Sequence, residues 1–111
     1  MLALKKPKLL HWTVHARAKM RQYALSEARV RRVLHSPVRI EEGIAEDTIA
    51  MMQPAAIKTS GKDKTWTQEI WVMIAETPKS RRVVSAWRYP GQTKLGTPLP
   101  TEVVRQLRAQ L

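Results

Sequence analysis

The first periodic pattern of apolar side chains lies near the start of the chain and has the spacing of a helix. Four residues recur at i, i+4, i+8 and i+11 and form one apolar stripe: Trp12, Ala16, Met20 and Tyr23. Thr13 suits the N-cap position, because its hydroxyl can accept a hydrogen bond from a free N–H group of the first turn. The pattern therefore predicts a helix over about 13–23.

A second helix is predicted over about 27–35, after a short joint at 24–25. Ser26 is a suitable N-cap, and the apolar face consists of Val30, Val33 and Leu34. Pro37 ends the helix, because the residue before a proline disfavours helical backbone.

Alternating and continuous apolar runs in the middle of the chain predict an antiparallel sheet over about 38–89. The strands are expected at 38–42, 48–53, 66–75 and 81–89. The last two runs are separated by a short loop, which predicts a hairpin ending in Trp87-Arg88-Tyr89 before Pro90. The polar stretch 54–64 predicts an exposed connection.

The order of these segments predicts an α+β fold in one domain spanning 1–111. Residues 1–11 form a basic lead-in, and Pro7 argues against a helix there. Two N-terminal helices are expected to pack on a four-stranded antiparallel meander. Thr101 is expected to cap a C-terminal helix over about 101–110.

The composition limits the cellular compartments and the kinds of site that the chain is expected to have. The chain has no cysteine, which rules out disulfides and thiolate metal sites and is typical of a reducing compartment. The first residues lack the apolar block of a signal peptide, and no apolar run has membrane-spanning length. We therefore expect a cytoplasmic protein without a membrane partner.

The charge is unevenly distributed and strongly positive. Twenty Lys and Arg against nine Asp and Glu give a formal net charge of +11. Residues 1–35 contribute nine basic residues and one acid, whereas residues 36–50 contribute one basic residue and four acids. Clustered positive charge favours a polyanionic partner, and we expect RNA. The plainer alternative is a soluble basic protein whose charge only solvates its surface.

No metal or cofactor is expected. His11 and His15 are four residues apart, but the Glu of a His-Glu-x-x-His motif is missing and no further ligand is evident. The few carboxylates argue against a two-metal nuclease. Metal-free RNA cleavage needs a base, an acid and cations that stabilise the charge on the phosphate, and His, Tyr, Lys and Arg can provide all of these.

The candidate residues follow from this requirement. The catalytic candidates are His15, Arg88 and Tyr89, and the candidate RNA contacts are Arg17, Lys19, Arg21, Arg81, Arg82 and Lys94. Each has a structural alternative. His15 can be a helix-flank residue bonded to backbone or water, Arg88 can pair with an acid, and Tyr89 can pack at the strand end.

The N-terminal half also resembles a known family. The pattern is formed by His15, Met20, Leu25-Ser26, Val30, Val33, Leu34 and Pro37. It resembles the opening of a small bacterial family grouped with RelE-like toxins, in the barnase–EndoU–colicin–RelE fold group. Lys19 and Tyr23 stand where that family often has Arg. The resemblance covers about residues 11–90. It implies RNA-directed or toxin-like activity and carries His15 over as the motif residue.

Three hypotheses follow from the residues and the resemblance. The first is a metal-independent RelE-like endoribonuclease or toxin, with His15 as base or acid, Arg88 as phosphate stabiliser and Tyr89 or Lys94 as auxiliary donor. The second is a non-catalytic nucleic-acid-binding or ribosome-associated module. The third is an interaction domain whose basic face meets an acidic partner such as an antitoxin.

Overall fold

The structure, a computed structural model, describes residues 9–42 and 47–94, together with residues 101, 104, 105 and 108. Two helices lie in the N-terminal part, α1 (Val14–Gln22) and α2 (Glu27–His35). The strands are β1 (Leu9–Trp12), β2 (Arg39–Glu42), β3 (Thr48–Pro54), β4 (Lys58–Ser60), β5 (Asp63–Thr65), β6 (Gln68–Glu76) and β7 (Ser80–Pro90).

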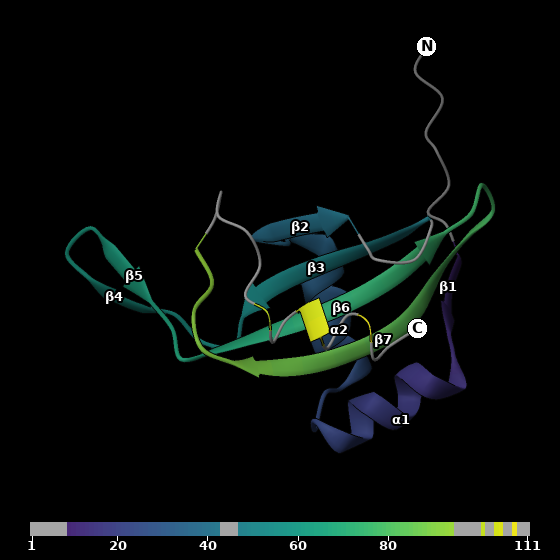
Figure 1. Cartoon of the computed structure of the whole chain (residues 1–111), viewed down its shortest axis with the longest axis horizontal. Coiled ribbons are helices and arrows are strands. Elements are labelled where there is room, and N and C mark those ends of the chain that lie inside the picture. Colours follow the sequence, from purple (N-terminus) through teal and green to yellow (C-terminus); the bar gives the residue numbers. More distant parts are fainter. Residues whose placement is uncertain (1–8, 43–46, 95–100, 102–103, 106–107, 109–111) are drawn as a thin grey trace, which may run out of the picture.

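The main sheet has five strands in the order β1-β7-β6-β3-β2 (Figure 1). β2, β3, β6 and β7 pair antiparallel, whereas β1 pairs parallel with β7. The predicted four-stranded antiparallel meander is therefore wrong: the sheet is mixed and has a fifth strand. That strand includes residues 9–11 of the expected basic lead-in. Its four residues alternate between exposed and half-buried, and so short a segment has no detectable period of its own.

Both helices begin at the residues that the sequence predicts as N-caps. The Thr13 hydroxyl accepts from the Ala16 amide at 3.0 Å and donates to the Val83 carbonyl on β7 at 3.0 Å. Ser26 accepts from the Arg29 amide at 3.0 Å. The caps therefore fix the first turn of each helix, and Thr13 also ties the junction of β1 and α1 to the sheet.

α1 ends in a Schellman motif. The Leu25 amide bonds the Met20 carbonyl at 2.8 Å, and the Ala24 amide bonds the Arg21 carbonyl at 3.3 Å. Ala24 has a φ of 53°, the left-handed conformation that glycine usually occupies at this position. Leu25 is buried beneath the turn, which fixes the direction in which the chain enters α2.

Both faces of the central strands β6 and β7 are buried. On one face, Ile70, Val72 and Val83 pack with Ala16 of α1 and Val30 of α2. On the other face, a second cluster contains Ala50, Met52, Trp71, Met73 and Trp87. The indoles of Trp71 and Trp87 stack there with centroids 6.2 Å apart and planes at 9°. The continuous apolar run in β6 follows from this two-sided burial.

Two further expectations need correction. The stretch predicted as a polar connection is not irregular, because β4 and β5 pair within it as a separate two-stranded sheet. Figure 1 shows this ribbon projecting from the body. The helix predicted over 101–110 lies mostly outside the described residues. The described residues of that stretch, 101, 104, 105 and 108, have helical backbone, and no helix with described bounds is assigned to them.

Candidate nucleic-acid interface

Two arginine side chains lie over the ring of Trp12 at the surface of the helices. Trp12 ends β1, directly before α1. The Arg17 guanidinium of α1 lies 5.7 Å from the centroid of the Trp12 ring, and that of Arg31 from α2 lies 5.5 Å away. Both distances are within the range of a cation–π interaction. We call these three residues the Trp12 clamp. It positions two guanidinium groups from different helices around one fixed indole.

Arg17 forms only a weak ion pair with Glu27 of α2. Its Nη1 atom donates to Glu27 Oε1 at 2.9 Å, but the two side chains are 48% and 46% exposed. An exposed pair of this kind contributes about 0–1 kcal/mol. A phosphate can therefore compete with Glu27 for the guanidinium. Glu27 is also the one acid within 9–35, a segment with six Lys and Arg.

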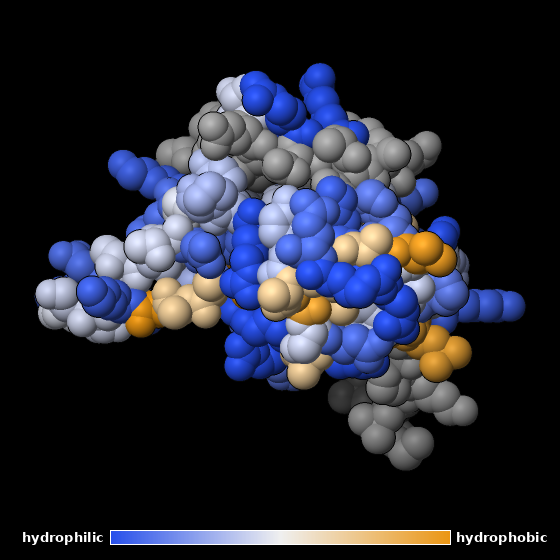
Figure 2. All heavy atoms as spheres, turned by 90° about the horizontal axis from the view of Figure 1, so that it is seen from below, coloured by the Kyte–Doolittle hydropathy of each residue, from blue (hydrophilic) through white to orange (hydrophobic). Residues whose placement is uncertain are grey.

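The arginines around the Trp12 clamp extend the positive surface. Arg21 on α1 and Arg32 on α2 are exposed. With Arg17 and Arg31 they form what we call the basic helix surface. Figure 2 views the molecule from the side of α1 and shows strongly hydrophilic side chains over much of that face. Within this surface, Arg17 forms an ion pair with Glu27 of α2.

Arg29 of α2 and Arg88 of β7 lie between the helices and the sheet. Arg29 donates to Gln53 Oε1 at 2.6 Å and to the Pro54 carbonyl at 2.9 Å. Burial lowers the pKa of Arg29, and the positive charges of Arg32 and Arg88 lower it further. The Arg29 guanidinium is therefore repelled by those of Arg32 and Arg88, and a nearby anion would relieve that repulsion.

Arg88 supports the end of α1. Its Nε atom donates to the Tyr23 carbonyl at 2.8 Å, and Nη2 approaches the Ala24 carbonyl at 3.4 Å. These carbonyls belong to the helix end, where backbone acceptors lack partners within the helix. Arg88 thus bonds to backbone carbonyls, whereas the structural alternative considered above was an ion pair with an acid.

The structure does not bring His15 and Arg88 together. His15 is exposed in the first turn of α1, whereas Arg88 binds at the last turn. Eight residues of helix separate positions 15 and 23, which is about 12 Å along the axis. Two groups that hydrogen-bond one phosphate lie within about 8 Å of each other. These two side chains therefore do not share a phosphate in this arrangement.

Tyr89 and Lys94 lie on the other side of the sheet from α1. Tyr89 pairs in register with Glu69 and packs on the cluster of Trp71 and Trp87. Arg88 pairs with Ile70, which faces the helices. Consecutive strand residues point to opposite faces, so Arg88 and Tyr89 cannot act on one substrate atom. The catalytic trio expected from the sequence is therefore divided between two faces.

The remaining candidates occupy two regions. Lys19 is half-buried on α1, near the basic helix surface. Arg81 pairs with Glu76 beside the β6–β7 turn, with Nε to Oε1 at 2.9 Å. Arg82 is exposed on the same end of β7, opposite His11 of β1. The structure therefore groups Lys19 with Arg17 and Arg21 on α1 and places Arg81 and Arg82 beside the β6–β7 turn.

A buried carboxylate organises the second face. Glu69 is fully buried and accepts hydrogen bonds from the indoles of Trp66 and Trp71 at 2.9 and 3.1 Å. It also accepts from the Thr93 amide at 2.7 Å and from the Thr93 hydroxyl at 2.9 Å. Charged acceptors make such bonds strong. Glu69 thereby joins the start of β6 to the segment after β7.

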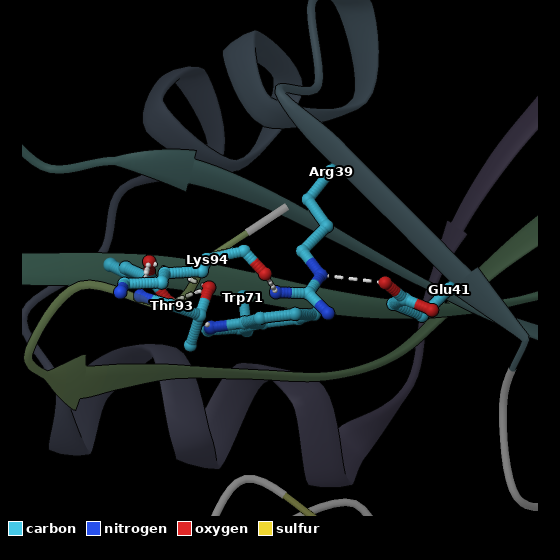
Figure 3. A network of polar contacts seen from close by, with 6 residues as sticks. Arg39, Glu41, Trp71, Thr93 and Lys94 are labelled. Atoms are coloured by element: carbon cyan, nitrogen blue, oxygen red, sulfur yellow. Dashed lines mark hydrogen bonds and ion pairs between the residues drawn. The ribbon is translucent and has the colours of Figure 1, made fainter. Parts of the chain in front are cut away.

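Arg39 holds the next residue of that segment. It is buried on β2, its Nε donates to Glu41 at 2.6 Å, and its Nη1 donates to the Lys94 carbonyl at 2.9 Å (Figure 3). Thr93 and Lys94 are thus fixed to the sheet by two different strands. This arrangement explains why Lys94 is on the side away from α1.

The sequence contained signals for the residues that were missed. Trp12 stands directly before a helix cap, and Arg31 and Arg32 fall off the apolar stripe of α2. Each signal is visible alone, but the contact of Arg31 with Trp12 depends on how α2 packs beside β1. In the sequence, Glu69 is one of the few acids of a predicted strand. Its burial depends on how the strands pair and on where residue 93 lies.

Three other features would indicate a function: a ligand cavity, a metal site and a membrane-spanning helix. A cavity of about 390 Å³ is lined by Glu42, Asp47, Thr48, Ile49 and Glu76, which suits neither RNA nor another anion. Among the described residues, no group of three or more His, Asp or Glu is arranged to hold a metal ion. No helix in the described part of the chain is long and apolar enough to span a bilayer.

Comparisons with protein-family models, with curated proteins and with solved structures found no match to this chain. The resemblance to RelE-like toxins therefore stays a prediction.

Proposed function

We propose that this protein binds RNA without cleaving it, through the basic helix surface. The observation that carries the proposal is the Trp12 clamp, in which one indole holds guanidinium groups from two helices. Guanidinium groups bind phosphate in a planar, bidentate geometry. Side chains that are already ordered lose less entropy when a ligand binds.

The chemistry of the surface favours RNA over a protein partner. Exposed guanidinium groups can stack on unpaired bases, which RNA loops and bulges supply. Arg17 and Arg31 place two such groups, with their phosphate-binding N–H groups, over the Trp12 ring. An acidic protein would neutralise the charge but has no bases to stack on the guanidinium groups.

The geometry argues against a nuclease. Cleavage needs a base, an acid and a charge stabiliser around one phosphate. His15 is at one end of α1, Arg88 serves the other end, and Tyr89 faces the opposite side of the sheet. Binding without catalysis therefore agrees best with these positions.

The test compares two variants that remove the same charge. In R17Q/R31Q the Trp12 clamp loses both cations, whereas K79Q/R82Q removes two cations at the β6–β7 turn. Affinity for a fluorescent RNA is measured across a range of salt concentrations. Two lost phosphate contacts should reduce the slope of log K against log salt by about 1.4 for a single strand.

K79Q/R82Q should lose less slope than R17Q/R31Q, at most about 0.7 for the single contact that the sequence assigns to Arg82. Equal loss in both variants would show that only net charge matters and would refute the interface. The same RNA should stay intact with or without EDTA. Cleavage that disappears in H15A would instead restore the nuclease hypothesis.

A further inference from the structure

The β4–β5 ribbon, which we call the arm, is more than the connection between β3 and β6 requires. β3 and β6 are antiparallel neighbours in register from Thr48↔Ala75 to Pro54↔Glu69. Strands in this relation can be joined by a two-residue turn. The chain instead inserts residues 55–67, and every side chain from 56 to 65 is exposed. The arm therefore adds surface without adding core.

The conformation of the arm is defined by local structure. Ser60 and Asp63 close the ribbon around Gly61 and Lys62. Gly61 has a φ of 61°, and Lys62 is not among the residues with positive φ. A positive φ at the first central residue alone is the pattern of a type II′ turn, which favours a hairpin. A charge-rich ribbon is thus presented in a definite shape.

The arm is also anchored firmly at its root. The Trp66 indole donates to the buried carboxylate of Glu69 at 2.9 Å, and the Trp66 amide donates to Gln92 at 3.2 Å. On the other strand, the Ala55 amide donates to the Gln68 carbonyl at 2.9 Å. An isolated two-stranded hairpin is marginally stable in water, so these root contacts direct the arm away from the body.

The lysines of the arm lie on both of its faces. Lys58 pairs with Thr65, and Lys64 pairs with Thr59. Residues directly opposite each other share a face, and neighbours along a strand alternate. Lys58 and Lys64 therefore point to opposite faces, and Lys62 lies in the turn. Asp63 is the one acid of 58–65.

We infer that the arm bridges the two phosphate strands of a duplex segment of RNA. A single strand needs cations on one face of a ribbon, whereas a groove is bordered by phosphates on both sides. Lysine ammonium groups bind phosphate as point charges without base specificity. The arm extends about 10 Å beyond its root by strand rise. This inference rests on the proposed RNA binding and specifies the RNA as partly double-stranded.

The experiment compares an RNA stem-loop with an unstructured RNA of equal length. The variants are K58Q, K64Q and K58Q/K64Q, with K79Q as a single-charge control outside the arm. Each lost contact to a duplex should reduce the slope of log K against log salt by about 0.9. The double variant should therefore lose about 1.8 in slope on the stem-loop, or up to about 60-fold in affinity at about 0.1 M salt.

On the unstructured RNA, the double variant should lose no more than about 0.7 in slope, because one face of the arm suffices there. K58R/K64R should keep wild-type binding. G61V retains every charge but is strained by the positive φ of that position, and it should weaken stem-loop binding specifically. This variant separates the shape of the arm from its charge.

Several results would overturn the inference. If K58Q/K64Q binds the stem-loop like wild type while R17Q/R31Q does not, RNA binding stands and the arm has no part in it. Equal losses on both RNAs would refute the bridging of two strands. Stronger arm-dependent binding to a DNA duplex would refute the assignment to RNA. Failure of the wild-type protein to bind either RNA would instead refute the proposed function.

Discussion

Replacing the buried carboxylate of Glu69 should destabilise the fold and loosen the root of the arm. Four donors converge on this group: two indoles, one amide and one hydroxyl. In E69Q the new amide group must face at least one of these N–H donors. The least unfavourable arrangement puts the NH2 group of Gln at the position of Oε1. Only the Trp71 indole then loses its acceptor, because the Thr93 hydroxyl can rotate toward the other oxygen.

The magnitude follows from these contacts. A buried donor without a partner costs about 1–3 kcal/mol. The remaining bonds lose their charge assistance, which roughly doubles such bonds. Relief of the desolvated charge offsets part of this loss. We therefore expect E69Q to lower the free energy of unfolding by about 2–3 kcal/mol. T93V, which removes only the hydroxyl, should lower it by about 1 kcal/mol.

Urea denaturation followed by tryptophan fluorescence measures both variants. Because Glu69 bonds Trp66, E69Q should also weaken the arm-dependent binding of the RNA stem-loop, whereas T93V should not. A free energy of unfolding for E69Q within about 0.5 kcal/mol of wild type would contradict this reasoning. It would mean that water or a shifted side chain satisfies the donors equally well.

Three further expectations concern the helices and the charge. A24G should raise the free energy of unfolding by about 1 kcal/mol in thermal denaturation, because glycine accepts the left-handed conformation of this position without strain; a decrease would refute it. Added NaCl should stabilise the protein by about 1 kcal/mol, because screening weakens the repulsion within a chain of net charge +11; a melting temperature that falls with salt would contradict this. W12L should weaken RNA binding by up to about fivefold, because Arg17 and Arg31 lose the ring that orders them, and only part of the two cation–π contacts of about 0.5–1 kcal/mol each enters the binding free energy; unchanged affinity would remove the Trp12 clamp from the interface.

The helices were predictable because their signals are local. Thr13 and Ser26 satisfy N–H groups three residues away, so the sequence alone identifies both caps. The hairpin of β6 and β7 was predictable for a similar reason, since its two apolar runs are joined by a short turn. These features depend on neighbours in the chain.

The errors involve pairings between distant residues or segments with weak patterns. β1 pairs with a strand about seventy residues away, Leu9 with Ser80, and its four residues give no signal for that partner. The arm buries no apolar side chain, so its residues have no hydrophobic period. Its hairpin depends on Gly61 and on the root contacts.

For the candidate site, the exposure of some residues was predictable, whereas their arrangement was not. The polar side chains of His15, Arg17 and Arg21 lie off the apolar stripe of α1, and all three are exposed. Residue types alone do not reveal that Arg88 bonds the end of α1, or that Tyr89 faces the opposite side of the sheet. Such placements depend on strand register and on helix docking, which involve the whole fold.

The most direct test of the RNA interface is to follow the four tryptophan indole N–H signals by NMR during titration with RNA. Four tryptophans give four signals, and W12F assigns that of Trp12. The Trp12 signal should shift with RNA, while those of Trp71 and Trp87, buried on the other face of the sheet, should stay unchanged. Shifts of Trp71 and Trp87 with a constant Trp12 signal would place the RNA elsewhere and contradict the proposal.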